Sequence, residues 1–311
     1  MMQYPYSVHV PPKSNDAVRV AFLGDVVGRP GRTVLKVLLP RIKEQLQLDV
    51  VIANGENAAG GAGIDAGTAQ EIRAAGAQLI TLGDHAFQRK GVVDFLNAQG
   101  SAAGHAKTVD HTNQSRDPSK VWCIRPLNHP RGTPGYGWCI SHVLENKRML
   151  LVNLIGRVFV SGPQTCPFYA IDDLLKSDVR REDDIVVVDF HAEATSEKLA
   201  MARFLDGRAS LLVGTHTHVQ TADAQILSQG LGYITDLGMC GSNNGVIGMK
   251  SEVALKRFLS PTPAPYEVAE GAPLLSGVVA DLSISGRRAL WISPLRVSQT
   301  SEMVSQGTGQ D

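Results

Sequence analysis

Short apolar runs alternate with amphipathic stretches along most of the chain. Runs rich in β-branched residues predict buried strands at 18–23, 49–53, 78–82, 185–190 and 211–213. Apolar residues at helical spacing follow several of them, and the clearest stripe, after Pro30, consists of Val34, Leu35, Leu38, Leu39 and Ile42. Such alternation predicts an α/β protein with its helices outside the sheets.

The pattern changes in two places. An alternating run at 137–143 and an apolar run at 148–154 predict an antiparallel hairpin, and 274–283 with 289–297 predict a second one near the end. We expect one domain from 18 to 297, built on two sheets, with Ser196 capping the helix that follows the strand at 185–190. The proline-containing segment 1–17 and the Ser, Gln, Gly and Thr-rich segment 298–311 predict flexible ends.

Composition narrows the class of partner. The 311 residues are 43% hydrophobic, and 30 basic residues balance 30 acidic ones. A neutral chain argues against an extended surface for nucleic acid or membrane, and no apolar run is long enough to span a bilayer. The N-terminus lacks the charge and apolar pattern of a secretory signal. Because the four cysteines are widely spaced, as a reducing compartment allows, we expect a cytoplasmic protein.

Metal-binding side chains gather where the predicted strands end. Carboxylates and imidazoles follow five apolar runs, namely Asp25, Glu56, Asp84 with His85, His191, and His216 with His218. The carboxyl ends of strands meet in a crevice, so these side chains should meet there. Any one of them alone is better explained as a helix cap or a core group. Together they exceed the needs of one ion, and they predict a two-metal hydrolytic site.

The histidine pair strengthens this interpretation. In an extended stretch, residues two apart point the same way, so His216 and His218 could share one site. Asp189 lies on the same side of its strand as His191 and is a candidate to orient that ring. The loop containing Gly60, Gly61 and Gly63 fits neither a dinucleotide fingerprint nor a P-loop, and we interpret it as backbone passing close to the site. The chain has no serine-nucleophile elbow and no zinc-protease helix motif.

At this point the sequence resembles a known family. The motifs Gly-Asp-Val-Val-Gly-Arg-Pro-Gly-Arg, Asn-Gly-Glu-Asn-Ala-Ala, Leu-Gly-Asp-His, Asp-Phe-His-Ala-Glu-Ala-Thr-Ser-Glu-Lys and Gly-Thr-His-Thr-His-Val-Gln-Thr-Ala-Asp occur in this order between Val18 and Val297. They are similar to those of the YmdB-type branch of the calcineurin-like metallophosphoesterases. The resemblance implies a four-layer α/β/β/α sandwich, a di-iron or di-manganese centre, and phosphodiesterase activity on 2′,3′-cyclic nucleotides.

The resemblance also implies roles for individual residues. Asp25 and His218 would bind one metal ion, Glu56 would bridge both, and Asp84, His191 and His216 would bind the other. Asn57 would lie in the inner shell, and His85 would protonate the leaving group after attack by a hydroxide held between the ions. Thr217 could offer its hydroxyl or its N–H to a phosphate oxygen. Four arginines could anchor phosphate or ribose, although each could equally be a surface residue: Arg29, Arg32, Arg125 and Arg157.

One ligand departs from the family pattern. The family has Gly-Asn-His where this chain has Gly-Asp84-His85. Aspartate adds a negative charge to those of Asp25 and Glu56, which leaves two divalent ions with one net positive charge rather than two. Our hypothesis is that this site holds its metals more tightly and acidifies coordinated water less.

The sequence is compatible with other functions. The metal ligands do not determine the substrate, so a phosphomonoesterase or a hydrolase of another phosphodiester fits as well. A slow-turnover regulator that senses a nucleotide or metal is a third alternative. The expected partner is a small phosphodiester, with no membrane and no extended nucleic-acid surface. Tyr136, Trp138 and the segment 163–170 would either cap the site or join subunits of a homo-oligomer.

Overall fold

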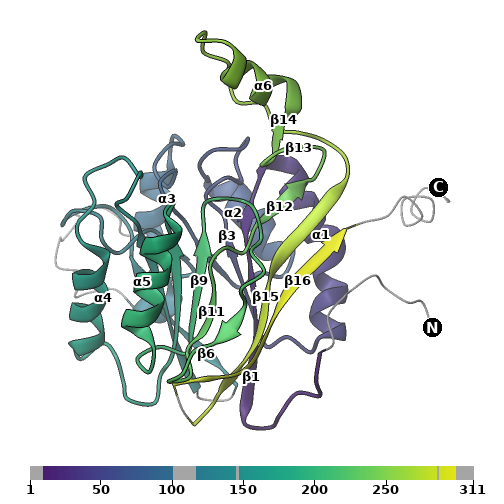
Figure 1. Cartoon of the computed structure of the whole chain (residues 1–311). Coiled ribbons are helices and arrows are strands. Elements are labelled where there is room, and N and C mark those ends of the chain that lie inside the picture. The colour runs from purple at the N-terminus through teal and green to yellow at the C-terminus, as the bar shows by residue number, and fades with distance from the viewer. Residues whose placement is uncertain (1–9, 101–116, 145–146, 286, 299–311) are drawn as a thin grey trace.

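Two β-sheets form the centre of the protein. The computed structural model describes residues 10–100, 117–144, 147–285 and 287–298. The larger sheet contains β1 (Ala17–Leu23), β2 (Asp25–Val26), β3 (Val50–Asn54), β4 (Leu79–Thr81), β5 (Cys123–Ile124), β12 (Met239–Ser242), β15 (Pro273–Ser283) and β16 (Ala289–Ser298). Its order is β2-β12-β15-β1-β3-β4-β5, with β16 paired to β15 (Figure 1). The strands β1, β3, β4 and β5 are parallel, and the predicted closing hairpin is β15–β16.

The smaller sheet contains the remaining predicted strands. It contains β6 (Trp138–Val143), β7 (Lys147–Ile155), β8 (Ile185–His191), β9 (Leu211–Thr215), β10 (Gln225–Ile226) and β11 (Gly232–Ile234), in the order β10-β11-β9-β8-β7-β6. The strands β7, β8, β9 and β11 are parallel, so their carboxyl ends lie at one edge. The predicted β6–β7 pair is antiparallel, and residues 145–146 of its turn lie outside the described residues.

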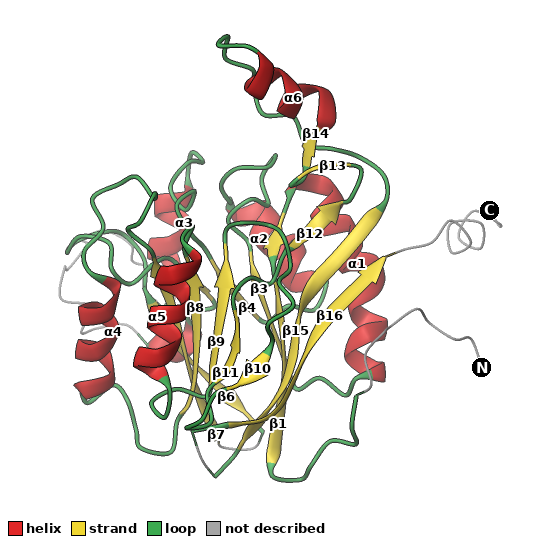
Figure 2. Cartoon of the chain, in the orientation of Figure 1, coloured by secondary structure: helices red, strands yellow, loops and turns green. Residues whose placement is uncertain are grey.

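Three apolar clusters define four layers. The first packs α1 (Gly28–Gln45), α2 (Ala66–Ala74) and α3 (Val92–Ala98) on the larger sheet. The second lies between the sheets, where Phe22 of β1 and Val187 of β8 are both buried. The third packs α4 (Pro167–Lys176) and α5 (Thr195–Leu205) on the smaller sheet. The predicted α/β/β/α sandwich is confirmed (Figure 2), and the predicted stripe of α1 is buried throughout.

A projection interrupts the last part of the chain. We call residues 243–272 the arm; it contains β13 (Gly245–Val246), β14 (Met249–Lys250) and α6 (Ser251–Leu259). Figure 1 shows α6 standing clear of the sandwich above the edge where β12 ends. Sequence analysis predicted only a glycine-rich loop and a short helix here. The arm is held together where its return segment meets β14, through an isolated bridge between Met249 and Val268.

Several local expectations need correction. The helix α5 begins at Thr195 with Ala194 at its N-cap and no side-chain cap, so Ser196 is not its cap. Tyr136 is buried in the cluster between the sheets and cannot cap the site or join subunits. Part of the expected N-terminal extension contacts the domain, because Lys13 Nζ lies 2.6 Å from Asp49 Oδ1. Residues 1–9 and 299–311, which make up most of the two predicted flexible ends, lie outside the described residues.

A short 3-10 helix, Pro118–Lys120, leads into β5. Within the described residues, no helix combines the length and the apolar character that crossing a bilayer requires. The four cysteines are free thiols.

Candidate metal centre and its cavity

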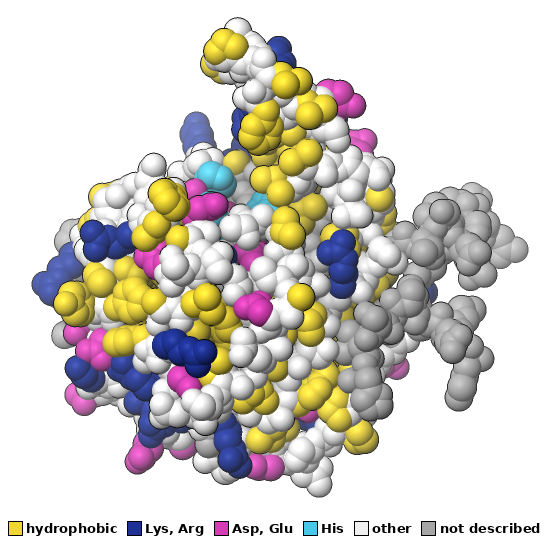
Figure 3. All heavy atoms as spheres, in the orientation of Figure 1, with side chains coloured by type: hydrophobic (Ala, Val, Ile, Leu, Met, Phe, Trp, Pro, Cys, Tyr) yellow, Lys and Arg dark blue, Asp and Glu magenta, His cyan; other side chains and the backbone are white. Residues whose placement is uncertain are grey.

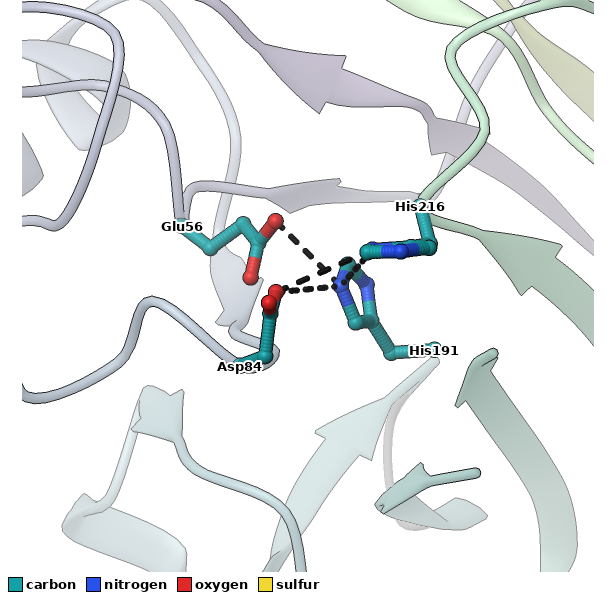
Figure 4. A group of neighbouring side chains, drawn as sticks. All are labelled: Glu56, Asp84, His191 and His216. Carbon is teal, nitrogen blue, oxygen red and sulfur yellow. Dashed lines mark hydrogen bonds and ion pairs between the residues drawn. The ribbon is translucent and has the colours of Figure 1, made fainter. Parts of the chain in front are cut away.

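Four predicted ligands converge on one point. Figure 4 shows Glu56 and Asp84, which follow strands of the larger sheet, facing His191 and His216. His191 is the last residue of β8, and His216 directly follows β9. His191 Nε2 lies 3.2 Å from both Glu56 Oε1 and Asp84 Oδ1, and 2.9 Å from His216 Nδ1. One potential ligand atom from each of the four lies within 4.8 Å of the others. The edge of the sandwich therefore brings together the set that we predicted for one metal ion.

Asp25 and His218 lie beside this group. Asp25 Oδ1 is 4.0 Å from His191 Nδ1 and 3.9 Å from His218 Nε2. It is buried and has no hydrogen-bond partner among the described residues, and the same is true of Asn57 Oδ1. Because an unpartnered buried oxygen is costly, two of them at one place indicate a ligand that the protein itself does not supply. A cation is the group that both oxygens could bind.

Each imidazole is oriented by an acceptor outside the centre. The Nδ1–H of His191 donates to Thr215 Oγ1 at 2.9 Å, and Thr215 in turn donates to Asp189 Oδ1 at 2.7 Å. His216 Nε2 lies 3.1 Å from Glu193 Oε2, and the Nδ1–H of His218 donates to the Ile247 carbonyl at 2.9 Å. These contacts leave the other nitrogen of each ring directed at the centre, as metal-binding histidines require. Asp189 thus orients His191 through Thr215, which is less direct than we expected.

The buried carboxylates and imidazoles of the centre shift one another's pKa values. Burial raises the pKa of Asp25 to about 7. Burial also opposes ionisation of Glu56 and Asp84, but the adjacent His191 outweighs it and holds the pKa of both carboxyls below the usual range. Burial lowers the pKa of His191, and the carboxylates of Glu56 and Asp84 overcome this and raise it well above the ordinary value. A proton on His191 and a metal ion would therefore compete for the same place.

This donor set fits a divalent metal ion. Three carboxylates, three imidazoles and the Asn57 amide combine hard oxygen with nitrogen ligands, a mixture that suits divalent transition metals. His191 Nε2 and His216 Nδ1 lie 2.9 Å apart, so a proton or a metal ion at this place would keep their lone pairs from facing each other. The group of Glu56, Asp84, His191 and His216 could therefore hold a metal ion.

A cavity of about 510 Å³ opens onto the centre. Glu56, Asn57, His216 and His218 line one side of it, and His85 reaches it from the loop after β4. His85 Nδ1 lies 2.8 Å from Gln88 Nε2 and 3.7 Å from Asp84 Oδ2, which leaves Nε2 free for a ligand. Figure 3 shows histidine side chains at the foot of the arm, with apolar side chains along the arm above them.

The loop between β9 and β10 differs from its expected form. His216 and His218 have φ angles of 102° and 65°, so they lie in the left-handed region and not in an extended stretch. Thr217 lines the cavity, but its N–H and its hydroxyl both donate to Asp236 Oδ2, at 3.1 and 2.7 Å. Both donors that we assigned to phosphate are therefore engaged. Thr217 holds the loop in place, and the predicted phosphate contact is not supported.

Sequence reasoning missed the residues on the opposite wall. None of the four arginines considered earlier lines this cavity, whereas Arg257 of α6 does, together with Ile247, Met249 and Tyr266 of the arm. Arg125, for example, donates to backbone carbonyls, including Pro126 O at 2.7 Å and Thr133 O at 3.0 Å. Sequence reasoning also did not identify Glu193 as a partner of His216. Strand-end position could have suggested Glu193, but no local pattern marks the arm residues.

The fold and the carboxylate–imidazole centre together define a metallophosphoesterase-type hydrolase. The YmdB-like protein family matches residues 21–295, and the chain belongs to this family. The resemblance that the motifs predicted is therefore confirmed.

Named relatives agree with this assignment. The chain is 41% identical to a 2′,3′-cyclic-nucleotide 2′-phosphodiesterase of Bacillus subtilis over 282 residues, which cover 90% of this chain and 97% of that protein. It is 31% identical to a putative phosphatase/phosphodiesterase of Mycoplasma pneumoniae, with 91% and 94% coverage. Both relatives span nearly the whole domain.

Two solved structures share the fold. A hypothetical protein from Thermus thermophilus superposes with a TM-score of 0.77 at 39% identity, covering 91% of this chain and all of that one. A structure described as a novel phosphatase from Mycoplasma pneumoniae has a TM-score of 0.79 at 29% identity, with 95% and 97% coverage.

Proposed function

We propose that this protein is a dinuclear metal-dependent phosphodiesterase that hydrolyses 2′,3′-cyclic nucleotides. The observation that carries the proposal is the group of Glu56, Asp84, His191 and His216, of which Glu56 and His216 line an open cavity. Asp25, with its unpartnered buried oxygen, lies beside this group. The name of the B. subtilis relative supports the substrate class. We further propose iron or manganese as the metal and a cytoplasmic location.

Each of the two proposed ions would have its own ligands. Asp25 and His218 would hold one ion, Asp84, His191 and His216 the other, and Glu56 would bridge them. When bound, the ions supply Lewis acidity toward the phosphoryl oxygens and a water activated near neutral pH. Asn57 lies at the entrance to this centre, with its Nδ2 3.1 Å from Glu56 Oε1, and would contact an ion or a phosphoryl oxygen.

His85 would transfer the proton to the departing ribose oxygen. Its Nδ1 is engaged by Gln88, so Nε2 is the atom that can act in the cavity. A general acid carries its proton on the atom that faces the leaving group, which here would be Nε2. A ribose alkoxide is a poor leaving group unless it is protonated, so this residue matters most for natural substrates.

The test compares leaving groups. We expect His85→Ala to lower kcat for 2′,3′-cyclic AMP by about 10²–10⁴-fold, and to lower that for bis(p-nitrophenyl) phosphate much less, because p-nitrophenolate leaves without protonation. An equal loss of kcat on both substrates would show that His85 does not protonate the leaving group. Wild-type protein that is saturated by the cyclic nucleotide without releasing a monophosphate would be a sensor, and activity confined to p-nitrophenyl phosphate would identify a phosphomonoesterase.

A further inference from the structure

The cavity has two chemically different walls. Metal-binding carboxylates and imidazoles form one, and Ile247, Met249 and Tyr266 of the arm form most of the other. A 2′,3′-cyclic nucleotide has the same division, with an anionic phosphate at one end and a flat, largely apolar base at the other. The volume of about 510 Å³ lies within the range of small-molecule sites.

Tyr266 is held in place by features on both sides of it. A Cβ atom on Gly61, whose φ is +89°, would lie only 2.3 Å from Tyr266 Cε1, so the ring packs directly on the loop that follows Asn57. The next residue, Glu267, accepts a hydrogen bond from the Lys250 N–H at 2.9 Å, and their side chains form an ion pair. The ring is therefore a fixed surface and needs little ordering when a ligand binds.

The arm is also connected to the metal centre. Its hairpin provides the Ile247 carbonyl that receives the Nδ1–H of His218. Arg257, in the same cavity, donates through Nε and Nη2 to the Ala264 carbonyl at 3.1 and 2.9 Å, which fixes the guanidinium beside the tyrosine. A base on Tyr266 would thus lie at a set distance from the metal ligands.

We infer that Tyr266 is the platform on which the base of the substrate stacks, so that the arm determines specificity for nucleotides over other cyclic phosphodiesters. The inference rests on the proposed function. Aromatic side chains stack with any base through their faces, so the platform selects for the presence of a base rather than for its identity.

The experiment compares substrates with and without a base. The probes are 2′,3′-cyclic AMP and ribose 2,3-cyclic phosphate, and the variants are Tyr266→Ala, Tyr266→Leu and Tyr266→Phe. We expect Tyr266→Ala to raise KM for the nucleotide by about 5- to 150-fold with little change in kcat. It should leave both constants for the base-free ester unchanged. The Tyr266→Leu side chain still fills the space against Gly61 but cannot stack, so this variant should behave like Tyr266→Ala, whereas Tyr266→Phe should behave like the wild type.

A matched control and a second readout keep the test decisive. Tyr169→Ala removes a tyrosine that is 74% exposed on α4 and should change nothing. Calorimetric binding of adenosine 3′-monophosphate against ribose 3-phosphate gives the same comparison without turnover. The inference would be overturned if Tyr266→Ala weakened binding of the nucleotide and of the base-free compound equally, or if it changed neither. Failure of the wild type to hydrolyse either ester would instead contradict the proposed function, and the binding comparison would still decide the role of Tyr266.

Discussion

Thr217 donates both its N–H and its hydroxyl to a single oxygen of Asp236, at 3.1 and 2.7 Å. The same oxygen accepts from Lys198 Nζ at 2.8 Å. Thr217 stands between two histidines with positive φ, and a non-glycine residue in that region costs about 1–3 kcal/mol. The buried carboxylate therefore offsets the strain of a loop that places both imidazoles at the metal centre.

Removing the hydroxyl of Thr217 should weaken metal binding. We expect Thr217→Val to reduce the affinity for Mn²⁺ by about 10–100-fold, in the range of other residues that orient metal ligands, because the loop loses one of its two bonds to Asp236. Calorimetric titration of the metal-free protein measures this. Thr165→Val removes a hydroxyl that donates to Asn128 O at 3.0 Å and should leave the affinity unchanged. Equal Mn²⁺ affinities in the two variants would show that Thr217 does not position the loop.

The Lys198–Asp236 pair should matter for stability. Both side chains are almost completely buried, so Lys198→Met would leave an uncompensated carboxylate and lower the free energy of unfolding by about 3–5 kcal/mol. Lys176→Met is the control, because Lys176 forms an exposed pair with Asp172 on α4 and its loss should cost little. Urea unfolding measures both. Similar values for the two variants would contradict this account of the pair.

Thr215 should act on metal binding through His191. Thr215→Val removes the acceptor of the His191 Nδ1–H and the donor to Asp189. We expect about a 10–100-fold loss of Mn²⁺ affinity and recovery of most of it in Thr215→Ser, which restores the hydroxyl. If the serine variant binds no better than the valine variant, packing rather than the hydrogen-bond relay explains the effect.

Asp84 should affect both affinity and pH dependence. Asp84→Asn removes a charge 3.2 Å from His191 Nε2, so we expect weaker metal binding. A more positive centre acidifies coordinated water more strongly, so the rising limb of the activity profile should move to lower pH. Asp94→Asn, on the exposed side of α3, should change neither property. A profile that stays in place or moves to higher pH would refute the hypothesis.

Sequence predicted most of the sandwich and the meeting of Glu56, Asp84, His191 and His216, for a physical reason. Strand and helix periodicities are local, and these side chains lie at or just after the ends of strands. The arm could not be found this way, because Tyr266 reaches the cavity through a contact with Gly61 that only the folded chain creates. The role of Thr217 was misjudged because its loop is not extended and because its partner Asp236 belongs to another strand end.

Two metal ions held by this centre are expected to drive hydrolysis of a cyclic phosphodiester. The most direct measurement is metal content together with 2′,3′-cyclic AMP hydrolysis, recorded on protein stripped by a chelator and then titrated with Mn²⁺ or Fe²⁺. We predict no turnover in the stripped protein and activity that rises until about two ions per chain are bound. Turnover that persists without metal, or ions bound at this ratio with no hydrolysis of the cyclic diester, would contradict the account.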